Sequence, residues 1–64
     1  MVKVTKNVLD GLEAVRSSGM VNMLDTSGVI RCAEKLGFAE TANWIRENKD
    51  AYWDGVFVGF ESGS

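Results

Sequence analysis

The chain alternates between stretches in which apolar side chains recur every three to four residues and short breaks that are polar or contain glycine. Four stretches have this spacing, over about residues 5–17, 25–36, 39–48 and 50–58. Residues three and four positions apart lie on one face of a helix, so each stretch predicts an amphipathic helix. We therefore expect an all-α fold: a compact bundle of three to four short helices in one domain over residues 1–60.

Capping residues mark the ends of these predicted helices. The Thr5 side chain can accept a hydrogen bond from the first turn of the first helix, and Gly19 can take the left-handed conformation that ends it. Asp25, or the two hydroxyl residues after it, can cap the second helix, and Gly37 is placed to end it. Gly11, inside the first helix, either allows a close helix crossing or is simply tolerated.

The segment between the first two helices, residues 20–25, is too apolar for a solvated loop. We predict an extended linker whose Met and Leu side chains fill the core, because methionine adapts to irregular gaps. A short strand that pairs with its copy in a second chain is the alternative.

Residues 50–60 fit two patterns. Tyr52 and Val56 have helical spacing, whereas alternate residues after them are apolar, as in a strand. We predict a short helix over residues 50–58, followed by a flexible tail over residues 61–64.

Length and composition bear on how such a fold is stabilised. The chain has 64 residues, one cysteine and no histidine. A domain of this size buries only about 60% of the surface that its unfolded chain exposes. Neither an internal disulfide nor a zinc site of the usual ligands is available, so we expect a homodimer and no cofactor or metal. We interpret Cys32 as a small, partly buried apolar side chain. A lone cysteine also fits a reducing compartment, so we expect the protein in the cytoplasm.

The chain is weakly acidic, because it has 7 basic and 9 acidic residues and therefore a net charge of −2. This balance is not the basic footprint of a protein that binds a phosphate backbone. No stretch approaches the roughly 20 apolar residues that span a membrane, and no signal-peptide pattern follows the first lysines.

Catalytic patterns are also missing from the sequence. There is no glycine-rich phosphate loop, no metal-ligand cluster and no Ser–His or Cys–His pair. Asp50 and Asp54 are four residues apart, but solvation near a helix start explains them better than acid–base chemistry. We do not expect an enzyme.

A helix-turn-helix DNA-binding regulator is the alternative function. Ala33 and Gly37 have the spacing of its turn. However, Asn43 and Arg46 stand where the second helix needs apolar residues to pack on the first. Few basic residues are available for phosphate contacts, so we place DNA binding second.

The aromatic residues all lie in the second half of the chain, which has six of them. Each ring buries roughly 150–250 Å² when enclosed, so either they form the core or some line a contact surface. Both interpretations stay open. The residues that we expect to contact a partner or a second copy are Met23, Leu24, Trp44, Tyr52, Trp53 and Phe57. We expect Asn22 and Asp25 to satisfy backbone groups around the linker.

Three short strings carry a resemblance to a known family: residues 19–25 (GMVNMLD), residues 33–38 (AEKLGF), and residues 44–49 (WIRENK) with Tyr52-Trp53. Together they resemble a family of short proteins of unknown function encoded by phages and prophages of Gram-positive bacteria. The resemblance covers about residues 8–58. The family often has Tyr after the Phe of the Gly-Phe turn, whereas Ala39 follows Phe38 here.

This resemblance implies a small protein that inhibits host machinery. Some similar proteins counter anti-phage defences, and a helicase–nuclease system such as Hachiman is one target that it suggests. We accordingly expect a phage protein that binds a host protein and inhibits a defence system by occupying a surface, with aromatic anchors inside a polar rim. The family resemblance includes no catalytic motif that could be assigned to residues of this chain.

Overall fold

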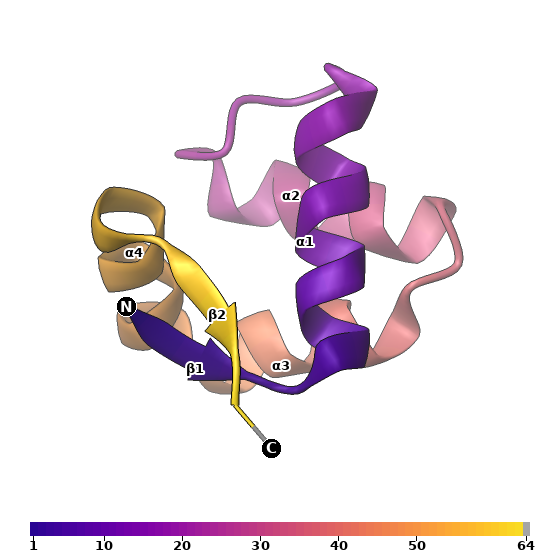
Figure 1. Cartoon of the computed structure of the whole chain (residues 1–64). Coiled ribbons are helices and arrows are strands. Elements are labelled where there is room, and N and C mark those ends of the chain that lie inside the picture. Colours follow the sequence, from indigo (N-terminus) through magenta and orange to yellow (C-terminus); the bar gives the residue numbers. More distant parts are fainter. Residues whose placement is uncertain (64) are drawn as a thin grey trace.

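Four helices and two short strands make up the computed structural model, which describes residues 1–63 (Figure 1). In chain order they are β1 (Val2–Val4), α1 (Lys6–Ser18), α2 (Thr26–Lys35), α3 (Ala39–Glu47), α4 (Lys49–Val58) and β2 (Phe60–Ser62). The prediction of a mostly helical, compact fold is confirmed. Residues 50–58, whose pattern fitted both a helix and a strand, lie in the helix α4. None of these helices has the length and apolar character needed to cross a bilayer.

The predicted helix ends are confirmed. The Thr5 hydroxyl accepts a hydrogen bond from the Val8 amide at 3.2 Å, and Gly19 has φ 67°. Asp25 accepts from the Gly28 amide at 3.1 Å. After α2, Gly37 has φ 91°, and the amides of residues 37 and 38 donate back to the carbonyls of residues 34 and 33. This is a Schellman motif, which satisfies carbonyls that the helix leaves without partners.

The apolar faces of the helices meet in one core. The fully buried hydrophobic side chains include Val8, Val15, Val29, Ile45 and Tyr52. Most of them were expected to face inward from their helical spacing. The pattern of apolar positions therefore identifies the packing faces of α1, α2 and α3.

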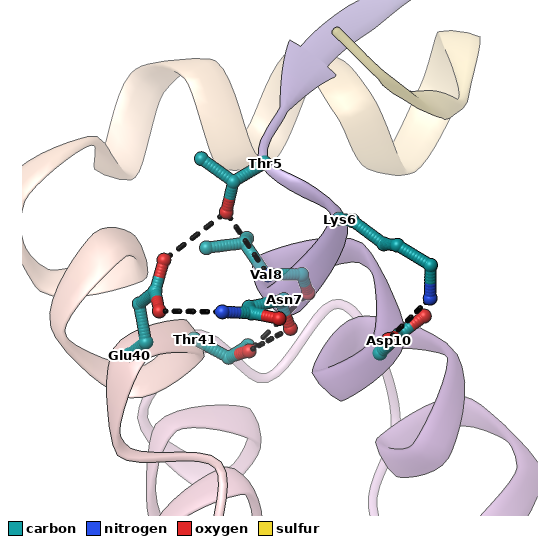
Figure 2. Close-up of polar contacts among 7 residues, drawn as sticks. All are labelled: Thr5, Lys6, Asn7, Val8, Asp10, Glu40 and Thr41. Carbon is teal, nitrogen blue, oxygen red and sulfur yellow. Dashed lines mark hydrogen bonds and ion pairs between the residues drawn. The ribbon is translucent and has the colours of Figure 1, made fainter. Parts of the chain in front are cut away.

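Thr41 of α3 lies against the first turn of α1, as Figure 2 shows. The crossing of the two helices is close because Gly11 has no side chain. A Cβ atom on Gly11 would lie 2.0 Å from Thr41 Oγ1 and 2.7 Å from Thr41 Cβ. The buried Thr41 hydroxyl donates to the Val8 carbonyl at 3.2 Å. On the exposed side of this helix crossing, the Glu40 carboxylate accepts hydrogen bonds from the Thr5 hydroxyl and the Asn7 side-chain amide (Figure 2). Of the two roles considered for Gly11, the structure supports the close crossing.

The two strands correct the all-α prediction. β1 and β2 pair in parallel and join the two ends of the chain, with Val2 opposite Phe60 and Val4 opposite Ser62. Residues 61–64 were expected to be a flexible tail, but Glu61 and Ser62 belong to β2, and Ser64 lies outside the described residues. The reason is physical: these three-residue strands are specified by pairing with the far end of the chain, which a local pattern does not reveal.

The linker between α1 and α2 is compact rather than extended. The Asp25 amide donates to the Asn22 carbonyl at 2.9 Å, and the Asn22 side chain accepts from the Leu24 amide at 2.8 Å. The predicted backbone roles of Asn22 and Asp25 are thus confirmed. Met23 packs partly buried against the core, whereas Met20 and Leu24 are exposed, so only part of the linker fills the core.

Candidate interaction surface

The six aromatic side chains fall into three groups. Tyr52 is completely buried. Phe38, Trp44 and Phe60 are partly buried against the core. Trp53 and Phe57 are exposed, with 44% and 67% of their surfaces accessible. Some of the aromatic residues therefore belong to the core, as one interpretation expected, whereas Trp53 and Phe57 are left exposed on the surface.

Tyr52 is a core residue, so its predicted role in partner contact is wrong. Its hydroxyl donates to the carbonyl of Met23 at 2.5 Å, which ties the linker to α4. Burial, with a further contribution from the Asp25 carboxylate, raises the pKa of Tyr52 from 10.0 to about 12. A buried tyrosine with a satisfied hydroxyl stabilises the fold and offers nothing to a partner.

Phe60 holds α4 against the rest of the molecule and was not among the expected site residues. Its ring lies 5.9 Å from that of Tyr52 and meets Trp44 edge to face at 6.1 Å. A Cβ on Gly55 would lie 2.1 Å from the Phe60 ring, so glycine is what allows this contact. Trp44 is consequently held on the core side, although it remains partly accessible.

The outer side of α4 presents the exposed rings. The Trp53 and Phe57 ring centroids are 5.5 Å apart with an interplanar angle of 72°, an edge-to-face pair. Val58, in the last turn, is 58% exposed. We call Trp53, Phe57 and Val58 the α4 patch. α4 lies at one margin of the molecule in Figure 1, with α1 on the other side of β2.

A cleft of about 320 Å³ lies between α1 and α4. Its lining is mostly apolar and includes Leu9, Leu12, Met23, Val56 and Phe60. The charged Glu13 and Arg16 of α1 also line it. The cleft is an apolar recess next to α4, of the size that accepts a few side chains.

The cysteine and the acidic residues are the candidates for a reactive or metal-binding site. Cys32 is buried, and its Sγ atom lies 3.8 Å from the Ser18 hydroxyl oxygen. Among residues 1–63 no three His, Cys, Asp or Glu side chains gather in a way that could hold a metal ion. The exposed rings of α4 are thus the feature of the described chain that most needs an explanation.

The α2–turn–α3 unit has features that bear on the helix-turn-helix alternative. Arg46, the one basic residue of α3, forms an ion pair with Glu34 at 2.6 Å and a hydrogen bond with Asn43 at 3.1 Å. Glu40 and Glu47 are exposed on the same helix. The outer surface of α3 therefore offers no unpaired cation to a phosphate.

Comparison with known protein families gives a match over most of the chain. The family described as "Domain of unknown function (DUF5049)" matches residues 4–59. No curated protein and no solved structure matches the chain significantly.

Proposed function

The chain belongs to the DUF5049 family, a domain of unknown function, and we propose that it is a protein-binding module that inhibits a host protein by occupying a surface. The contact surface in this proposal is the α4 patch, with the neighbouring cleft as a recess for side chains of the partner. Leu24, which is 46% exposed in the linker, and Met23 at the cleft remain candidates for further contacts.

The observation that carries this proposal is the exposure of Trp53 and Phe57 on one helix. Their accessible parts amount to roughly 100 Å² each, given the area of an aromatic side chain. Covering both would gain about 5 kcal/mol before the costs of association are subtracted. Tryptophan and other aromatic residues are enriched at the centres of protein interfaces, where they contribute most of the binding energy.

The finer parts of the proposal come from the family resemblance and from size. We infer a phage or prophage protein that acts in the cytoplasm of its bacterial host, where an anti-phage defence system is the target. We also propose a homodimer, because a chain of 64 residues has little core with which to stabilise itself. Light scattering coupled to size-exclusion chromatography tests the dimer, and a stable monomer at micromolar concentration would contradict it.

The decisive test of inhibition is a plaque assay on hosts that carry individual defence systems, with and without the chain. We expect the chain to restore phage growth on at least one such host and Phe57→Ser to abolish the rescue. Leu36→Ser is the matched control, since Leu36 is also exposed, at 40%, but lies at the end of α2. Absence of rescue on every host, or full rescue by Phe57→Ser, would contradict the proposal.

DNA binding remains the second candidate because α2 and α3 are joined by a short turn. The ion pair of Arg46 with Glu34 counts against it. A gel-shift assay across a salt series tests it: tight binding that weakens steeply with salt would favour DNA over a protein partner.

A further inference from the structure

We propose that the α4 patch binds a protein surface in which an apolar pocket is bordered by lysine or arginine side chains. In this proposal the patch is not the interface of the homodimer. This inference rests on the proposed function, in which the patch binds a protein. It adds the chemistry of that partner and separates the target surface from the self-association surface.

Two carboxylates stand among the exposed apolar side chains of α4. At 100° per residue, Trp53, Phe57, Asp50 and Asp54 share a sector of about 100° on the helix surface. Both aspartates are exposed, and neither forms an ion pair within the described chain. Val58 lies just beyond Asp54, so this carboxylate sits between the aromatic pair and the valine.

A partner that covers Phe57 therefore comes within reach of Asp50 and Asp54. The exposed Lys49 is the nearest base on the helix, on the opposite flank beyond Trp53. The face of α4 that surrounds the rings thus carries one positive and two negative charges. Cationic groups around an apolar pocket complement this arrangement, whereas carboxylates there would repel it.

A second copy does not offer that complement. In a twofold dimer formed through the α4 patch, the same surface of α4 from each copy would meet. The symmetry axis would pass close to the level of residue 55 along the helix, midway between Trp53 and Phe57. Asp54 is next to that axis, so the two Asp54 carboxylates would approach each other. Lys49 lies six residues away, about 9 Å along the helix at 1.5 Å per residue, and is badly placed to neutralise them. Like charges brought together in this way destabilise an interface.

The test uses two synthetic amphipathic helical peptides with the same leucine face, one flanked by lysines and the other by glutamates. Isothermal titration calorimetry measures their binding to the full chain. We expect the lysine peptide to bind the wild-type chain and the glutamate peptide not to bind. Phe57→Ser should remove binding, and Asp50→Asn/Asp54→Asn should weaken it by roughly tenfold at low salt.

The matched control is Asp10→Asn/Glu34→Gln, which removes the same charge from exposed side chains of α1 and α2 that lie outside both the α4 patch and the cleft. We expect this control to bind the lysine peptide as the wild type does. Equal affinity for both peptides, no binding of the lysine peptide, or equal weakening by the Asp10→Asn/Glu34→Gln control would overturn the proposed chemistry.

Sedimentation equilibrium of the Phe57→Ser chain tests the second half of the proposal. We expect its self-association to equal that of the wild type, and dissociation of a wild-type dimer by this substitution would overturn the separation of the two surfaces. These outcomes do not depend on the plaque assay, so a failed inference and a failed proposed function are told apart.

Discussion

Replacement of Gly11 by alanine tests how closely α1 and α3 pack. The added Cβ would lie 2.0 Å from Thr41 Oγ1, 2.7 Å from Thr41 Cβ and 3.0 Å from Phe38 Cβ. Rotation of the threonine side chain can relieve the first contact but not the second, because Cβ is fixed to the backbone. The two helices must therefore move apart.

The magnitude follows from three contributions. Overpacking of a close contact costs about 1–3 kcal/mol. Displacement of the Thr41 hydroxyl weakens its hydrogen bond to the Val8 carbonyl, at about 1 kcal/mol. The higher helix propensity of alanine returns about 1 kcal/mol. We expect Gly11→Ala to lower the free energy of unfolding by about 2 kcal/mol, which lowers the Tm by roughly 10 °C in a domain of this size.

Urea denaturation followed by circular dichroism measures this loss. Gly19→Ala is the control, since nothing lies within 4 Å of its added Cβ and only its positive φ of 67° opposes alanine. If the contact is with Thr41, the double variant Gly11→Ala/Thr41→Ala should lose less than the sum of the two single changes. A Gly11→Ala chain as stable as the wild type would refute the close crossing.

Three further predictions concern the core. Tyr52→Phe should lose about 1–2 kcal/mol at neutral pH, because the Met23 carbonyl loses its donor. The folded-state pKa of Tyr52 is raised from 10.0 to about 12, so the contribution of its neutral hydroxyl to the free energy of unfolding is intact below pH 10 and is lost as the pH rises towards 12. The loss amounts to about 2–3 kcal/mol. It should be missing from the pH–stability curve of Tyr52→Phe. Gly55→Ala should displace the Phe60 ring and lower the free energy of unfolding by about 2 kcal/mol, and unchanged stability would contradict the contact. Cys32 should react with a thiol reagent only through unfolding, and equal rates with and without urea would contradict its burial.

Local signals made much of the helical fold predictable. A threonine or aspartate before a helix and a glycine after it act within one turn, so Thr5, Asp25 and Gly37 mark helix ends whatever the tertiary structure. The sheet had no such signal. β1 and β2 have three residues each, and their pairing depends on the return of the chain to its start.

The candidate site was predictable only in part, because α4 is apolar on two sides. Tyr52 with Val56, and Trp53 with Phe57, are two pairs with the same helical spacing. Spacing alone cannot decide which pair faces the core. Gly55 decides it, because it lets Phe60 approach the helix on the side of Tyr52 and leaves Trp53 and Phe57 outside.

Site-specific photo-crosslinking in bacterial cells tests the central claim, that the outer side of α4 contacts another protein. A photoreactive amino acid is placed at position 57, where the side chain is 67% exposed, and at the exposed position 17 of α1 as a control. We expect a discrete adduct of the chain with one other protein from position 57 and none from position 17. The same adducts from both positions, or none from position 57, would contradict it.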